Sequence, residues 1–304
     1  MRYVLSCSSA ILALVAHGQH TPLTSQYLFN GLLINPAYAG SRDAFAVNLT
    51  YRHQWVGMEG APVTQVLSVH SPVKGRKMGL GLTLYSDKIG VSRETGLMAN
   101  YAYRIKFRKG RLSFGLGGGA VMAQARWSEV ALQEQQDQVF ATDMRASFRP
   151  NFSGGAFYYK RSFFVGVSVP FLMGRRSSSN GIGWVSTMDL KQLQPMLTGG
   201  YVWKVSDHFK LKPSTLIRYQ ASSSLQADLN MNVFFRERFT AGLSYRTQDA
   251  LVGMFEVLPT PQWRFGYSYD LGLSAITPYH GGSHEIMVQY ELGYRIRVKD
   301  PRYF

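Results

Sequence analysis

The residue types most often used in catalysis are few in this chain and are poorly spaced for it. The histidines lie at positions 17, 20, 53, 70, 208, 280 and 284. None forms the HExxH spacing that holds zinc on one face of a helix, and no GxSxG sequence exposes a serine nucleophile. Some membrane β-barrels are enzymes that use a serine–histidine pair on the outer wall, and this is the enzymatic alternative. The sequence shows no such pairing. We therefore expect a protein that is not an enzyme and that uses no metal and no cofactor.

Charged residues near the C-terminus allow a different chemistry. His284 and Glu285 are adjacent, so in a strand their side chains point to opposite faces and make poor metal co-ligands. Arg264 and Asp270 are an even number of residues apart, so they share one face, where we expect a network of ion pairs. The glycines at 117–119 lie within an expected strand, which favours close packing or a bend over a phosphate-binding loop.

Period-two alternation of apolar and polar residues recurs from about residue 43 to the end of the chain. The segments are about 8 to 12 residues long, as tilted membrane strands require. Their polar face carries charged residues: Arg52, Arg104, Arg264, Asp270 and Glu291. Burying so many charges inside a small soluble sandwich is costly, whereas a barrel with a hydrated lumen tolerates them. Tyrosine and tryptophan near the strand ends are typical of the aromatic girdles at a membrane interface.

The composition agrees with strands that have one apolar and one polar face. Charged residues make up 17% of the chain, against roughly 25% in an average soluble domain. The net charge of +15 raises the possibility of nucleic-acid binding. The basic residues are scattered, however, apart from a group at 104–111, so we expect basic turns and no nucleic-acid partner. Such a surface could also meet lipopolysaccharide phosphates or acidic proteins.

The N-terminus resembles a secretory signal peptide. Arg2 precedes an apolar run at 3–16, and Ala16 and Gly18 place small residues at −3 and −1 before Gln19. We expect residues 1–18 to be removed and the mature chain to span 19–304. The single cysteine, Cys7, lies too early for a lipoprotein attachment site and would be lost. No other segment could span a membrane as a helix, so strands closed into a barrel must do so.

The expected fold is all-β: a transmembrane antiparallel β-barrel of about 14 strands with long loops on one rim. Three regions lack the strand pattern: 19–42, 125–147 and 174–195. Residues 19–42 form a segment before the first strand. The other two regions are expected to be long loops or short helices on one rim, with a plug of the lumen as the alternative.

Two early segments strongly resemble the beginning of the PorP/SprF family. They read SQYLFN at 25–30 and LINPAYAGS at 33–41. Further similar motifs follow in order: RHQWVG at 52–57, GAPVT at 60–64, GLG at 79–81, DKIG at 87–90, NYAYRI at 100–105, GYSYD at 266–270, GSHEI at 282–286 and PRYF at 301–304. The motifs at 52–64 and at 79–105 look like the first two hairpins of the family.

The resemblance implies an outer-membrane protein of the type IX secretion system, the export route associated with gliding motility. It also singles out residues with an expected structural or docking role: Asn35, Pro36, Tyr38, Gly40, Arg52, Gln54, Trp55, Gly57, Pro62, Asp87, Gly90, Tyr101, Tyr103, Tyr267, Asp270, His284 and Glu285. Asn35-Pro36 favours an extended residue and then a turn, so we expect a segment that lines the lumen or locks a rim, with a ligand site as the alternative. Trp55, at a strand end, is expected to be an interface anchor.

The functional expectation is therefore an outer-membrane barrel that belongs to, or assists, the type IX secretion and gliding machinery. It would act by docking ring or motor proteins of the machine, or a secreted cell-surface adhesin. Outer-membrane lipid and lipopolysaccharide would surround it. The alternative is a passive pore for small solutes, with a wet lumen that conducts.

Overall fold

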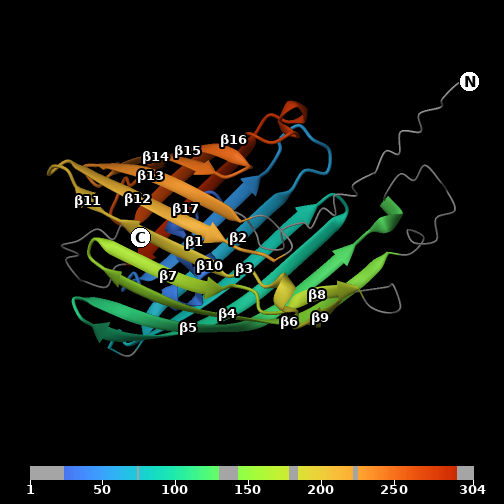
Figure 1. The fold of residues 1–304 in the computed structure, drawn as a ribbon, viewed down its shortest axis with the longest axis horizontal. Coiled ribbons are helices and arrows are strands. Elements are labelled where there is room, and N and C mark those ends of the chain that lie inside the picture. Colours follow the sequence, from blue (N-terminus) through green and yellow to red (C-terminus); the bar gives the residue numbers. More distant parts are fainter. Residues whose placement is uncertain (1–23, 74, 130–142, 178–183, 222–224, 293–304) are drawn as a thin grey trace, which may run out of the picture.

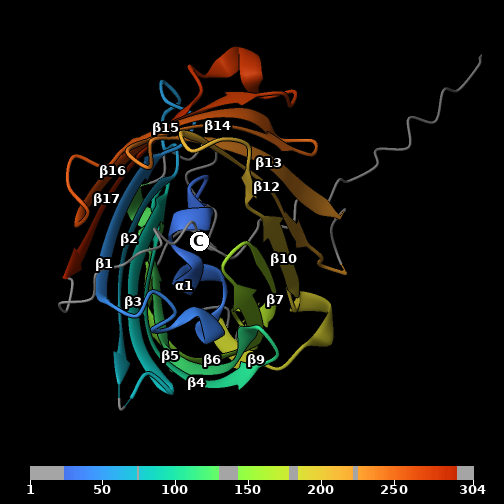
Figure 2. The same ribbon diagram turned by 90° about the vertical axis from the view of Figure 1, so that its left-hand side faces the viewer.

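The computed structural model describes residues 24–73, 75–129, 143–177, 184–221 and 225–292. Within these ranges, fourteen antiparallel strands close into one barrel (Figures 1 and 2). Closure occurs where β1 pairs with β17 and where β10 pairs with β12. In ring order the strands are β1 (Phe45–His53), β2 (Val63–Val73), β3 (Met78–Ile89), β4 (Ser92–Phe107), β5 (Gly110–Ala125), β6 (Met144–Lys160), β7 (Phe163–Val169), β10 (Met196–Tyr201), β12 (Phe209–Arg218), β13 (Gln226–Phe235), β14 (Phe239–Arg246), β15 (Ala250–Val257), β16 (Trp263–Gly272) and β17 (Ser283–Leu292). The expectation of about 14 strands is confirmed.

The two faces of the barrel wall differ as the alternation predicts. Apolar side chains such as Leu49, Leu82 and Leu116 are exposed on the outer face. Polar and charged side chains such as Asn48 and Arg52 are buried on the inner face. This pattern suits a wall with lipid outside and polar groups inside. No helix in the described ranges is long and apolar enough to cross a membrane.

The connections at the two ends of the barrel differ in length. The long-loop rim carries the connections 54–62, 126–143, 170–195, 219–225 and 273–282, besides the tight turns 90–91 and 247–249. The short-turn rim carries 74–77, 108–109, 161–162, 202–208, 236–238 and 258–262, with the two-residue strand β11 (Trp203–Lys204) in the fourth. Strand β1 begins and β17 ends at the short-turn rim. The expectation of long loops on one rim is confirmed.

The two expected loop regions differ in detail from the prediction. Strand β5 extends to Ala125, and β6 already begins at Met144, so the strands take both ends of 125–147. Between them lies η3 (Trp127–Glu129), and residues 130–142 are outside the described residues. The region 174–195 forms a small hairpin of β8 (Gly174–Ser177) and β9 (Trp184–Thr187), followed by η4 (Leu190–Gln192).

The inward charges are compatible with a hydrated lumen, with a plug as the alternative, and the structure places a segment of the chain inside the barrel. Residues 24–42 lie inside the barrel (Figure 2). We call this segment the plug. It contains η1 (Tyr27–Phe29), α1 (Gly31–Ile34) and η2 (Pro36–Tyr38), and nearly all of its residues are buried. The plug thus comes from the N-terminal segment and not from the two loop regions for which a plug was the alternative.

Candidate functional site: the plug and its seat

The sequence of the plug favours a sharp turn between α1 and η2. The side chain of Asn35, in extended backbone, accepts a hydrogen bond from the Ala37 amide at 2.9 Å. Pro36 then occupies the first position of η2, where its fixed φ fits and its missing N–H costs nothing. The Asn35 amide also donates to the carbonyl of Ala156 on the barrel wall at 3.1 Å. The Asn-Pro pair therefore turns the plug and ties it to β6.

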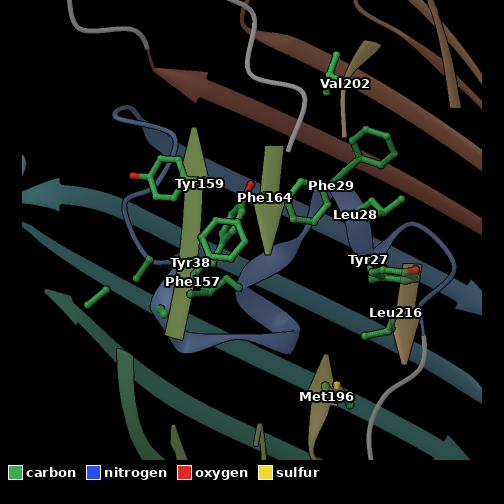
Figure 3. Close-up of a cluster of buried hydrophobic side chains, with 14 of the residues drawn as sticks. Tyr27, Leu28, Phe29, Tyr38, Phe157, Tyr159, Phe164, Met196, Val202 and Leu216 are labelled. Atoms are coloured by element: carbon green, nitrogen blue, oxygen red, sulfur yellow. The ribbon is translucent and has the colours of Figure 1, made fainter. Parts of the chain in front are cut away.

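Aromatic rings join the plug to the wall (Figure 3). The Tyr38 ring packs on Phe157 of β6 with centroids 5.6 Å apart. Phe29 contacts two buried cations, with the Nζ of Lys212 and the Cζ of Arg264 each 4.9 Å from its ring centroid. Cation–π contacts are stronger when the cation is desolvated. An aromatic ring of the plug thus takes the place of water beside these two cations.

Wall glycines make room for the plug backbone. A Cβ added to Gly79 would lie 2.0 Å from the carbonyl oxygen of Ala39, and one added to Gly115 would lie 2.1 Å from the Ala37 nitrogen. Both contacts are with backbone atoms, which cannot rotate away. At the end of the plug, Gly40 adopts a φ of +68°, a conformation that side chains disfavour. We call the wall surface around these glycines the seat.

One end of the plug is held near the long-loop rim by a group that we call the N-anchor: Ser25, Arg52, Arg246, Asp270 and Glu285. The Glu285 carboxylate accepts from the backbone amides of Ser25 and Gln26, at 2.6 and 2.9 Å. Arg52 bridges Asp270 at 2.8 Å and Glu285 at 3.2 Å. Arg246 adds contacts to Asp270 at 3.4 Å and to the Ser25 hydroxyl at 3.3 Å. The first residues of the plug are therefore fixed by carboxylates from β16 and β17.

Tyr27 extends this attachment across the barrel. Its hydroxyl accepts a hydrogen bond from the Asn230 amide of β13 at 2.7 Å. The buried phenol therefore acts as a hydrogen-bonding group between the plug and the wall.

The other end of the plug is held at the short-turn rim by the C-anchor: Gly40, Arg42, Asp43, Arg104 and Glu291. Arg42 forms an ion pair with Glu291 of β17, and its Nε donates to the Tyr38 hydroxyl at 3.1 Å. Arg104 donates to the Gly40 carbonyl and pairs with Asp43 at 3.0 Å. Buried charges held by several partners are costly to disrupt one at a time. Anchors at both ends therefore make the plug part of the barrel.

A family comparison decides what kind of barrel this is. Residues 16–290 match the family model described as type IX secretion system membrane protein PorP/SprF. The chain belongs to the PorP/SprF family. It is thus an outer-membrane β-barrel of the type IX secretion system family. A search of curated protein sequences returns no match.

Solved barrels overlap much of this PorP/SprF protein at low similarity. Omp33 of Acinetobacter baumannii has a TM-score of 0.48 and 8% identity, covering 82% of this chain and 98% of its own. A Pseudomonas aeruginosa FadL homologue has a TM-score of 0.48 and 10% identity, covering 91% and 96%. The KdgM porin has a TM-score of 0.37 and 11% identity, covering 82% and 99%. At these values none of them informs on the function of this chain.

The structure places the family-motif residues in three groups. Those inside the barrel lie in the plug or its anchors: Asn35, Pro36, Tyr38, Gly40, Arg52, Asp270 and Glu285. Those at the long-loop rim lie in or beside the turns of the first two hairpins: Gln54, Trp55, Gly57, Pro62, Asp87 and Gly90. Those on the outer wall are Tyr101, Tyr103, Tyr267 and His284. The motifs are therefore not gathered in one pocket, and the first group belongs to one structural unit.

The rim and wall groups have local partners. The Gln54 amide donates to the Pro62 carbonyl at 2.9 Å, which closes the first hairpin. Trp55 has a φ of +50°, and its ring lies 6.1 Å from that of His280. His284 and Glu285 point to opposite faces as predicted, with His284 hydrogen-bonded to Tyr267 at 2.7 Å on the outside.

The interior contains the expected network of ion pairs, but Arg264 and Asp270 do not pair with each other. Arg264 and Asp270 do share the inner face, but Arg264 pairs with Glu256 at 3.1 Å and Asp270 pairs with Arg52 and Arg246. Gly117 is closely packed as expected, since a Cβ there would lie 2.1 Å from the Ser153 hydroxyl. Several interior residues of the site were not predicted from the sequence: Ser25, Arg42, Lys212, Asp228, Arg246 and Glu256. Those that lie in strands could have been found from the period-two alternation, which places their side chains on the inner face of the wall.

Proposed function

We propose that this PorP/SprF protein is a docking component of the type IX secretion and gliding machinery and not a conduit for solutes. The observation that carries the proposal is the plug, because two buried anchors hold residues 24–42 across the lumen. A barrel occupied in this way offers its rims and outer wall to partners. The chemistry of such a protein is binding, and we propose no enzymatic role.

The two rims suit different partners of the machine. Outer-membrane barrels have short periplasmic turns and longer external loops. Ring or motor proteins in the periplasm would therefore meet the short-turn rim, and a secreted adhesin would meet the long-loop rim. The loop motif residues at that rim, Trp55 and Gly57 among them, are candidates for this second contact.

The route to the membrane and the lipid contacts complete the proposal. We expect Sec-type export with cleavage between Gly18 and Gln19, ahead of the plug.

Lipopolysaccharide in the outer leaflet would meet cations on the outer wall near the long-loop rim, such as Lys88 and Arg93. The passive pore remains the alternative function, and it requires a lumen free of the plug.

The proposal is tested by deleting the gene and measuring both export and permeability. We expect loss of export or surface display of type IX cargo, with small-solute uptake unchanged. Complementation with the wild-type gene restores export, and co-purification with the tagged protein identifies the partner. Normal export together with slower solute uptake in the deletion strain would favour the pore and refute docking.

A further inference from the structure

Basic side chains are concentrated at the short-turn rim. The exposed ones occupy five successive turns of the barrel: Arg76, Lys77, Lys106, Arg108, Lys109, Lys160, Arg161, Lys204, Arg236 and Arg238. Among the described residues, the exposed acids there are Asp207 and Glu237, which pair with Lys204 and Lys210. The excess of cations at this rim explains much of the net charge of +15.

Three of these cations lie against the outer wall and not over the lumen. The guanidinium carbon of Arg108 is 5.6 Å from the Phe107 ring centroid, and the ammonium of Lys160 is 5.7 Å from that of Phe163. Arg236 lies 5.3 Å from the ring of Phe235 in the same way. Strand alternation turns all three rings outward, toward lipid. The cations are therefore presented to the edge of the membrane.

The densest part of this surface spans the turns β4–β5 and β6–β7. We call it the aromatic–cation patch: Phe107, Arg108, Tyr158, Lys160 and Phe163. The rings of Phe107 and Tyr158 meet edge to face at 6.2 Å, and those of Tyr158 and Phe163 lie 6.4 Å apart. Tyr158 lies over Gly110, where a Cβ would be 2.8 Å from its hydroxyl. In the described part of the chain, neither cation of the patch pairs with a carboxylate.

We infer that the aromatic–cation patch binds the phosphate groups of anionic phospholipids in the periplasmic leaflet. Aromatic rings of membrane proteins gather at the headgroup level, and clustered cations beside them attract anionic lipid. The short-turn rim faces the periplasm, so lipopolysaccharide, which occupies the opposite leaflet, is not its ligand. An acidic protein docking from the periplasm would approach along the barrel axis, whereas Arg108 and Lys160 lie on the outer wall.

The test measures lipid retained by the purified full-length protein in detergent, using native mass spectrometry with phosphatidylglycerol and phosphatidylethanolamine added in equal amounts. We expect the wild type to prefer phosphatidylglycerol and the double variant Arg108→Gln/Lys160→Gln to lose about tenfold of that preference. The matched control is Arg126→Gln/Lys191→Gln, which removes one exposed arginine and one exposed lysine from the loops of the long-loop rim. It should keep most of the preference. Circular dichroism of each variant shows that the barrel has folded.

Four results would overturn the inference. The wild type could bind the two phospholipids equally. The patch variant could retain the wild-type preference, or the control could lose as much as the patch variant. Stoichiometric recovery of an acidic periplasmic protein that phosphatidylglycerol cannot displace would assign the patch to a protein instead. The first three results do not depend on whether the barrel serves secretion, because they are measured on the isolated protein with added lipid.

Discussion

The carboxylate of Glu285 joins the last strand to the first residues of the plug. It is fully buried, accepts two backbone amides of the plug, and lies 3.2 Å from the guanidinium of Arg52. Arg52 in turn reaches Asp270, so three strands meet the plug in one group. Removing one of these charged side chains leaves the others buried without a partner. The resulting loss of folding free energy is larger than the net contribution of the ion pair itself.

Replacing Glu285 with alanine tests this residue-scale account. We expect the substitution to lower the free energy of unfolding by about 3 kcal/mol, because Arg52 and two amides lose their acceptor. Urea titration of the folded barrel in detergent measures the change. Glu59→Ala, at an exposed position in a loop of the long-loop rim, is the control and should change the stability by less than about 0.5 kcal/mol. Equal effects of the two substitutions would contradict the role of the N-anchor.

At the scale of elements, the plug and the strands fit each other through small residues. Gly79 on β3 and Gly115 on β5 allow the plug backbone to touch the wall, and Asn35 fixes the turn between α1 and η2. A side chain at either glycine must displace the plug, the strand or both. A substitution at the seat therefore acts on the plug without changing any charge.

Gly79→Ala tests the seat. We expect the added methyl group to displace the plug near Ala39, because its Cβ would lie 2.0 Å from that carbonyl oxygen. Hydrogen–deuterium exchange of the plug amides should become faster, whereas exchange of the amides in the barrel strands should change little. Gly253→Ala is the control, since a Cβ there meets nothing within 4 Å. Unchanged exchange in the plug of Gly79→Ala would show that the seat does not hold it.

The strands could be predicted from the sequence, whereas the plug could not. Period-two alternation is a local signal, and it gave the outward residues, the inward charges and the strand number. The plug has no such period, and its attachments are distant along the chain, as between Ser25 and Glu285. The alternation also shows that an arginine such as Arg52 points inward, but it does not show whether that arginine contacts water or a buried carboxylate. The motif at 35–40 pointed to a lumen or rim segment but not to its contacts.

At the scale of the whole molecule, the barrel is closed in two senses. Its wall has no free edge in the described ring, because β1 meets β17 and β10 meets β12. Its interior is occupied by the plug from the N-anchor near one rim to the C-anchor at the other. The surfaces left for partners are the rims and the outer wall. A docking component needs only these surfaces, whereas a pore needs a lumen free of the plug.

Single-channel recording in a planar bilayer tests that closure most directly. We expect the purified wild-type protein to show no stable conductance, because the anchored plug occupies the lumen. The variant lacking residues 24–42 should conduct, and Gly79→Ala with Glu285→Ala provides a second opened form that keeps the chain length. A steady open-channel conductance from the wild type, equal to that of the plugless variant, would contradict the account and favour a pore.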